Sequence, residues 1–260
     1  MSGQKITLGV DVGSTTSKCV ILEDGKKLVG KALIAAGTGT GGPSKALDAV
    51  LADAGLGREQ IDYTISTGYG RRAEGLADSD MSELSCHAKG AQFLFPEAKT
   101  VIDIGGQDIK VMGIDDGIMT TFQMNDKCAA GTGRFMEVMA NVLGVKVSEL
   151  GELGALSTQA VQISSTCTVF AESEVISQLS NGAAVCDIIA GIHRSVASKV
   201  TGLVHRVGLR KPVVMTGGVS RNSDVIRALK EQLGCDIQTS ELSQYAGALG
   251  AALYGYQKIK

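Results

Sequence analysis

The chain has 260 residues, of which 25 are basic, 27 are acidic and 44% are apolar. Its net charge of −2 argues against a broad nucleic-acid surface, and no apolar run reaches the length of a membrane span. We therefore expect a cytoplasmic protein with neither nucleic-acid nor membrane partners. In that compartment its six cysteines are not expected to form a disulfide framework.

Strand and helix signals follow one another along the first part of the chain. They predict three strands within 5–35, a helix over 44–54, a strand over 61–67, and a helix from 82 or 85 to 95. A Gly-rich loop, 37–43, precedes the first helix. The high glycine content, 34 residues, is typical of a nucleotide-binding α/β protein.

The same order restarts at residue 100 with strand, turn and strand. The further predicted elements are helices over 132–143, 187–207, 223–233 and 246–256 and a strand over 213–215. Because the β-β-β-α-β-α order occurs twice, we expect two similar α/β halves with a cleft between them. The halves would be 1–97 and 98–260, and the second would hold Cys128, Cys167 and the Gly217–Gly218 turn, which are described below.

Residues 11–18 and 103–110 repeat one pattern, Asp-x-Gly-x-x-x-x-Lys. Each stretch follows an apolar run and continues as a second apolar strand, which predicts a β-hairpin. The hairpin tip offers N–H and hydroxyl donors to phosphate, and its Asp can hold Mg²⁺ through water. Two such hairpins facing each other would grip a triphosphate from both sides. For Lys18 and Lys110, the alternative is a solvated lysine at a strand end.

A third turn, Thr216-Gly217-Gly218-Val219, follows a strand and precedes a helix, and a helix of small residues occupies 246–252. Paired glycines allow close approach of the backbone to a ring or ribose. With the two hairpins, this ordered set resembles the actin, hexokinase and heat-shock chaperone superfamily of ATP-binding proteins. The resemblance implies two ribonuclease-H-like halves and an ATP site.

It also implies a role for each motif residue. Asp11 would hold Mg²⁺ through water, and Gln107 would orient the attacking water, with Asp103 as the competing candidate. The phosphates would contact, on one side, Gly13, Ser14, Thr15, Thr16, Ser17 and Lys18, and on the other Asp103, Gly105, Gly106, Gln107 and Asp108. The adenosine would lie against Gly217 and Gly218, with Gln244 nearby.

Cys128 and Cys167 each stand just before a predicted helix, after glycine-rich or hydroxyl-rich residues. Free N–H groups and the helix dipole favour thiolates there and can donate to the sulfides of a cluster. Two cysteines are too few for a four-iron cluster, but a two-fold dimer doubles them at its axis. The alternative is a pair of small buried residues. Cys19 is expected in the core, and Cys86 and His87 are expected in the core or an interface rather than as ligands.

Three segments narrow the resemblance: Asn-Asp-Lys-Cys-Ala-Ala-Gly-Thr-Gly-Arg-Phe (125–135), Ser-Ser-Thr-Cys-Thr-Val-Phe-Ala-Glu-Ser-Glu (164–174) and Met-Ser-Glu-Leu-Ser-Cys-His-Ala (81–88). They are similar to the activators, or component A, of (R)-2-hydroxyacyl-CoA dehydratases. This similarity implies a homodimer with one [4Fe–4S] cluster per dimer, held by Cys128 and Cys167 of both subunits. It also implies ATP hydrolysis to ADP, with Mg²⁺, driving transfer of one electron to the dehydratase for a radical dehydration.

The same resemblance implies ferredoxin or flavodoxin as the electron donor and an oxygen-sensitive protein of anaerobic amino-acid fermentation. Three rival functions remain open at this point. They are an ATPase subunit of a benzoyl-CoA reductase, a small-molecule kinase of the same fold, and a nucleotide-switched filament or chaperone-like protein.

Overall fold

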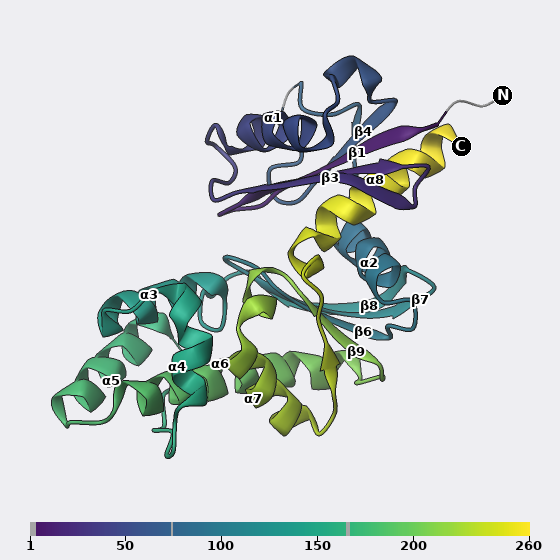
Figure 1. Cartoon of the computed structure of the whole chain (residues 1–260). Coiled ribbons are helices and arrows are strands. Elements are labelled where there is room, and N and C mark those ends of the chain that lie inside the picture. The colour runs from purple at the N-terminus through teal and green to yellow at the C-terminus, as the bar shows by residue number, and fades with distance from the viewer. Residues whose placement is uncertain (1–3, 74, 165–166) are drawn as a thin grey trace. The chain divides into compact units, whose positions relative to one another are not determined.

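The computed structural model describes residues 4–73, 75–164 and 167–260. The chain divides into two compact units (Figure 1). The first contains the chain up to Ala98 with Ile114–Thr120 and Leu242–Lys260, and the second contains Lys99–Gly113 and Thr121–Glu241. Each unit is built on a five-stranded mixed sheet, so the prediction of two similar α/β halves is confirmed.

The sheet of the first unit has the order β3-β2-β1-β4-β5. Its strands are β1 Ile6–Val12, β2 Ser17–Glu23, β3 Lys27–Ile34, β4 Tyr63–Thr67 and β5 Ser79–Asp80. β1 pairs antiparallel with β2 and parallel with β4. Side chains alternate along β2, so that Cys19 and Ile21 enter one apolar cluster while Val20 and Leu22 enter another.

Helices cover the two faces of this sheet (Figure 1). α1, Gly42–Ala54, packs over Cys19 and Ile21, and α8, Ala246–Ile259, packs over Val20 and Leu22. α2, Glu83–Leu94, lies along α8. α1 begins before the predicted residue 44 because Pro43, with its fixed φ, suits the first helical turn.

Glycines let α8 lie unusually close to its neighbours. A side chain at Gly9 on β1 would overlap the carbonyl of Ala248, and one at Gly90 on α2 would overlap the carbonyl of Ala246. The small residues of α8 therefore fix residues 242–260 in the first unit. A division of the chain into halves after residue 97 does not coincide with these compact units, because it would assign α8 to the second half.

The sheet of the second unit has the order β10-β9-β6-β7-β8. Its strands are β6 Thr100–Ile104, β7 Ile109–Asp115, β8 Ile118–Asn125, β9 Val213–Thr216 and β10 Ile237–Gln238. β6 pairs antiparallel with β7 and parallel with β9, as β1 does with β2 and β4. The two hairpins therefore occupy equivalent places in the two sheets.

Helices α3 to α7 pack together with this sheet in one large apolar core that includes Phe135, Met139, Ile192 and Val196. They are α3 Gly133–Leu143, α4 Leu150–Ala155, α5 Thr168–Ser180, α6 Val185–Val207 and α7 Ser223–Leu233. Short 3₁₀ segments are Arg58–Gln60, Val147–Glu149, Gly218–Arg221 and Ser243–Tyr245. Within the described residues, no helix has the length and apolar character needed to cross a membrane.

Candidate functional site

The first hairpin joins β1 to β2 and is closed by backbone bonds. Asp11 and Lys18 are cross-strand partners, and the Gly13 N–H donates to the Thr16 carbonyl at 3.0 Å. The Gly-rich loop packs on this turn, because the Thr38 N–H donates to the Gly13 carbonyl at 2.9 Å. The predicted phosphate-binding residues 13–17 therefore form one tight, externally braced turn.

Asp11 is only 2% exposed, and its Oδ1 atom has no hydrogen-bond partner among the described residues. Its Oδ2 atom lies 3.5 Å from Lys18 Nζ. Two glycines leave space beside the carboxylate, since a Cβ at Gly68 would come 2.5 Å from Oδ1 and one at Gly247 would come 2.8 Å from Oδ2. A buried acceptor without a donor is costly, and a water bound to Mg²⁺ would satisfy it.

The second hairpin repeats this geometry. Asp103 and Lys110 are cross-strand partners, and the Gly105 N–H donates to the Asp108 carbonyl at 3.0 Å. The charged cross-strand pair of this second hairpin is more deeply buried than that of the first. Lys110 is 2% exposed and its Nζ lies 3.6 Å from Asp103 and 2.6 Å from Asp108, so it is not the solvated lysine considered above. Gln107 stands at the tip of this hairpin with an exposed side chain.

Asp103 is also tied to β9. Thr216 Oγ1 donates to Asp103 Oδ1 at 2.7 Å, and both residues are buried. The next residue, Gly217, has φ of +82°, and a side chain there would overlap the Ile104 carbonyl. The Gly217–Gly218 turn thus packs against the second hairpin, as a shared nucleotide site requires. Gln244 lies in the first unit, and its place beside the adenosine stays a prediction.

The second hairpin is bonded directly to helix α3. The Gly133 N–H donates to the Gly105 carbonyl at 2.9 Å, and the Arg134 N–H donates to the Gly106 carbonyl at 2.8 Å. These are first-turn amides of the helix that follows the Cys128 loop. Any displacement of the Gly105–Gly106 turn therefore acts on the start of α3.

Cys128 is a half-buried cysteine in the loop before α3. Asn125 Nδ2 donates to the Cys128 carbonyl at 2.8 Å, and Lys199 Nζ on α6 donates to the Cys128 Sγ at 3.4 Å. The loop thus fixes the backbone of Cys128. The Cys128 sulfur contacts a cation on α6, a helix that is distant in the sequence but adjacent in space.

Cys167 is also half-buried and free, and it is the N-cap residue of α5 in extended conformation. Residues 165–166, which precede it in the predicted motif, lie outside the described residues. Among those described, no three His, Cys, Asp or Glu side chains gather to hold a metal ion. Each of the two thiols is a candidate ligand for a cluster.

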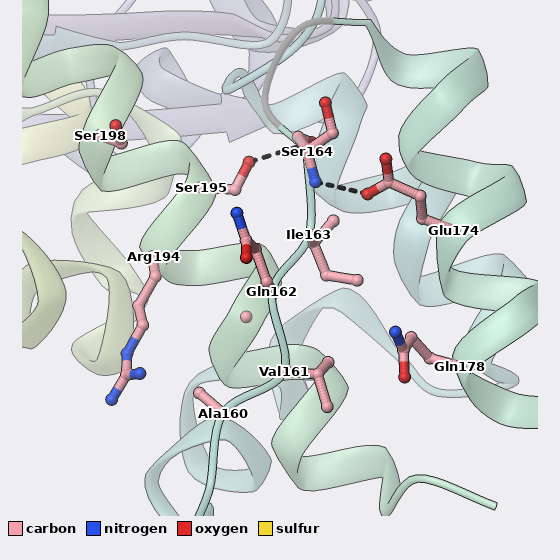
Figure 2. Close-up of a pocket in the computed structure, with 11 residues that line it drawn as sticks. Ala160, Val161, Gln162, Ile163, Ser164, Glu174, Gln178, Arg194, Ser195 and Ser198 are labelled. Atoms are coloured by element: carbon pink, nitrogen blue, oxygen red, sulfur yellow. Dashed lines mark hydrogen bonds between the residues drawn. The ribbon is translucent and has the colours of Figure 1, made fainter. Parts of the chain in front are cut away.

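The segment before Cys167 is held from two sides (Figure 2). The Ser164 N–H donates to Glu174 Oε2 on α5 at 2.5 Å, and Ser195 Oγ on α6 donates to the Ser164 carbonyl at 3.3 Å. Beside this segment lies an open, mostly polar hollow of about 700 Å³ between α5 and α6. One wall of this hollow is therefore formed by residues 160–164, which precede Cys167 in the chain.

The other cysteines differ from this pair. Cys19 and Cys86 are fully buried, and burial raises the pKa of each thiol to about 12, so both stay protonated at neutral pH. The core position predicted for Cys19 is confirmed, and Cys86, predicted in the core or an interface, lies in the core. His87, predicted in the core or an interface, is buried as well. A Cβ at Gly247 would lie 2.9 Å from its Nε2 and 2.8 Å from Asp11 Oδ2, so His87 also neighbours the candidate Mg²⁺ site.

The fold of the chain is of the actin and hexokinase type. It resembles the glucokinase of the ROK family from Streptomyces griseus with a TM-score of 0.58 and 16% identity, covering 97% of this chain and 99% of that one. Residues 8–255 match the sequence profile of the BadF/BadG/BcrA/BcrD ATPase family, and the chain belongs to that family.

Within the family, several relatives are similar over nearly the whole chain. The (R)-2-hydroxyglutaryl-CoA dehydratase activating ATPase of Acidaminococcus fermentans is 65% identical, covering 97% of both chains. The activator of lactoyl-CoA dehydratase of Anaerotignum propionicum is 56% identical, covering 96% of this chain and 97% of that protein. A subunit of the benzoyl-CoA reductase of Thauera aromatica is 34% identical, covering 96% and 93%.

Two solved structures are similar to this chain in three dimensions. Component A of the Acidaminococcus fermentans (R)-2-hydroxyglutaryl-CoA dehydratase has a TM-score of 0.95 at 65% identity, covering 98% of both chains. The activator of the 2-hydroxyisocaproyl-CoA dehydratase from Clostridium difficile, with bound ADPNP, has a TM-score of 0.95 at 53% identity, covering 97% of this chain and 95% of that one.

Proposed function

We propose that this ATPase activates a (R)-2-hydroxyacyl-CoA dehydratase by ATP-driven transfer of one electron. In the proposed assembly, two chains share one [4Fe–4S] cluster held by Cys128 and Cys167 of each. Such a cluster supplies one electron at a time. The identity of 65% to the activating ATPase of the 2-hydroxyglutaryl-CoA enzyme favours that acyl group, although specificity for the acyl group would lie in the dehydratase.

The observation that carries the proposal is the bond between the second hairpin and α3. Gly133 and Arg134 donate to the carbonyls of Gly105 and Gly106 at 2.9 and 2.8 Å. A γ-phosphate bound at this hairpin would hold the turn in one position, and its loss would release it. Because Cys128 lies on the loop leading into α3, this movement would reach the cysteine without passing through the rest of the core.

The two aspartates support different roles at the nucleotide. The partnerless oxygen of Asp11 supports water-mediated Mg²⁺ binding. Asp103 already accepts from Thr216 and faces Lys110, which leaves it poorly placed to serve as a base. The exposed amide of Gln107 is therefore the better candidate for orienting the attacking water. The other hairpin residues and Gly217–Gly218 would bind phosphates and adenosine.

The chemistry of the cysteines supports the dimer. A four-iron cluster needs four thiolates, and the described residues of one chain bring no third ligand to this pair. A two-fold axis beside the starts of α3 and α5 would supply the second pair. Ferredoxin or flavodoxin would deliver the electron to this site before ATP hydrolysis drives it onward.

A component of a benzoyl-CoA reductase is the second candidate, supported by the 34% identity to the Thauera aromatica protein. The much higher identity to three dehydratase activators, from 53% to 65%, favours the first. A kinase or a filament-forming ATPase of this fold would need no pair of cysteines at helix starts. If the chain had either of these last two functions, the purified protein would be colourless.

The composition of the anaerobically purified protein tests the cluster. We expect about four iron and four sulfide per dimer, the content of one cubane. Cys128→Ala and Cys167→Ala should each lose the brown colour, whereas the matched control Cys186→Ala, another half-buried free cysteine, should keep it. A fully iron-loaded Cys167→Ala dimer would refute the assignment.

Coupling needs a separate experiment. The dithionite-reduced protein is mixed with dehydratase and either ATP or ADPNP, and both phosphate release and dehydration are followed. We expect dehydratase activation with ATP only, in proportion to hydrolysis. If ADPNP activates the dehydratase as fast as ATP, hydrolysis is not the driving force, and the nucleotide site is structural or regulatory.

A further inference from the structure

One face of helix α6 reaches both cysteine segments. Ser195 and Lys199 are four residues apart, so their side chains project from the same side of the helix. Ser195 bonds the Ser164 carbonyl at 3.3 Å, three residues before Cys167, and Lys199 bonds the Cys128 sulfur at 3.4 Å. α6 therefore supports the segments of both candidate ligands, and Lys199 is a charged group on that face.

The path of Lys199 to the sulfur is built into the loop. Gly131 has φ of +89°, and a Cβ there would come 3.3 Å from Lys199 Cδ. The half-buried lysine stem thus passes over a residue that has no side chain, and its Nζ atom ends beside Cys128. No carboxylate among the described residues forms an ion pair with Lys199, so its charge is directed at the sulfur.

We propose that Lys199 is a positioning residue that orients Cys128 and raises the reduction potential of the cluster bound there. This inference rests on the proposed function. One electron from a donor such as dithionite or a ferredoxin, taken up without a proton, makes the cluster and its thiolates one charge more negative. A cation donating to a ligand sulfur stabilises that state over the oxidised one.

The consequence concerns the entry of the electron. A nearby positive charge makes the resting cluster easier to reduce, so a donor of ordinary low potential suffices to load it. The subsequent delivery against the potential of the substrate then depends on the ATP-driven step. In a two-fold dimer, two Lys199 side chains would act on one cluster from opposite sides.

An anaerobic redox titration tests this with Lys199→Met, Lys199→Arg and the control Lys230→Met. Lys230 is a half-buried lysine of the same unit that pairs with Asp236. At the wild-type midpoint, we expect the reduced-to-oxidised ratio of Lys199→Met to fall about tenfold, equivalent to about 59 mV for one electron. Lys199→Arg should fall between this variant and the wild type, and Lys230→Met should match the wild type.

An iron-loaded Lys199→Met dimer whose midpoint equals that of wild type would overturn the inference. If Lys199→Met loses iron while its circular dichroism and ATPase rate stay normal, retention of iron by Lys199→Arg supports charge-based positioning. Loss of iron from both variants would overturn the inference, because the shape of the Lys199 side chain would then matter more than its charge. If wild type itself holds no cluster, the proposed function has failed, which is a distinguishable result.

Discussion

The two hairpins have the same sequence pattern and the same backbone geometry but different surroundings. Both pair an Asp with a Lys across the strands and close the turn with a bond of 3.0 Å. In the first, the Asp keeps an oxygen without a partner among the described residues, and the lysine is 14% exposed. In the second, the Asp is bonded to Thr216 and the lysine is enclosed. The motif thus determines the backbone turn. The residues packed around the Asp determine whether its carboxylate is available to a ligand or is already bonded within the protein.

The largest difference between the two hairpins should be in the free energy of unfolding that is lost when the lysine of each is replaced. Lys110→Met should cost about 3–5 kcal/mol of unfolding free energy, because it leaves the buried Asp103 carboxylate without its cation. Lys18→Met should cost less than this, because the contact of Lys18 with the buried Asp11 is longer, at 3.5 Å, and the lysine side chain is partly exposed. Urea denaturation of the cluster-free protein, followed by circular dichroism, measures both. Equal losses would contradict the described contrast between an enclosed and an open hairpin.

Exchange of each aspartate for asparagine should separate activity from stability. Asp11→Asn should lower the ATPase rate about 10²- to 10³-fold with little change in stability, because it weakens Mg²⁺ handling and breaks no hydrogen bond of Oδ1. Asp103→Asn should instead lower stability by about 1–3 kcal/mol, because it weakens the contacts to Thr216 and Lys110. ATPase assays over a Mg²⁺ series and urea denaturation give the two signatures. The same signature in both variants would mean that the aspartates are equivalent.

The hairpin tips offer a smaller test of the same contrast. Gln107 and Thr15 occupy matching positions in the two repeats. Gln107→Ala should slow hydrolysis about ten- to a thousandfold, as expected for loss of a group that positions water or stabilises charge. Thr15→Ala, which removes one phosphate donor, should raise KM more than it lowers kcat. If kcat is unchanged in Gln107→Ala, this amide does not position the water.

The smallest effect should come from the bond to α3, which the second hairpin has and which is not described for the first. Proline is tolerated at the first helical position, so Gly133→Pro keeps the helix but removes the N–H donor to Gly105, and its ring carbon, in place of the amide hydrogen, pushes against the Gly105 carbonyl. Loss of one such bond, about 0.5–1.5 kcal/mol, should lower dehydratase activation per ATP about two- to tenfold while hydrolysis continues. Gly133→Ala is the matched control, because it adds a Cβ 3.1 Å from the Gly105 carbonyl and keeps the N–H. Equal activation per ATP in the two variants would argue against this bond as the link.

Local patterns predicted most of the fold. The repeated Asp-x-Gly-x-x-x-x-Lys stretches became β1–β2 and β6–β7, and Ser82 precedes α2 as its N-cap. The predicted boundaries differ from the observed ones by a few residues, as in α8, which continues to Ile259. The placement of α8 in the first unit could not be read from local periodicity, since it depends on the fit of its carbonyls over Gly9 and Gly90.

The candidate site was predictable only where its residues belong to motifs. The turns and the two helix-start cysteines carry local signals, and they lie where those signals indicated. Lys199 belongs to no such motif, and the 81–88 segment that contains His87 does not indicate its closeness to Asp11, because each residue comes from the middle of a helix far along the chain from its partner. Only the packing of α6 against the Cys128 loop, and of α2 beside Asp11, brings them to the site.

The buried position of α8 has a consequence for biosynthesis. Residues 246–253 of α8 are all buried in the first unit, against a strand that leaves the ribosome more than two hundred residues earlier. The second unit, which ends at Glu241, is complete before that helix is made. The unit that begins the chain therefore finishes folding last, and until then the apolar residues Val20 and Leu22 of its sheet have no covering helix. Nascent chains stalled before residue 246 should bind chaperones through this face and be sensitive to proteases there.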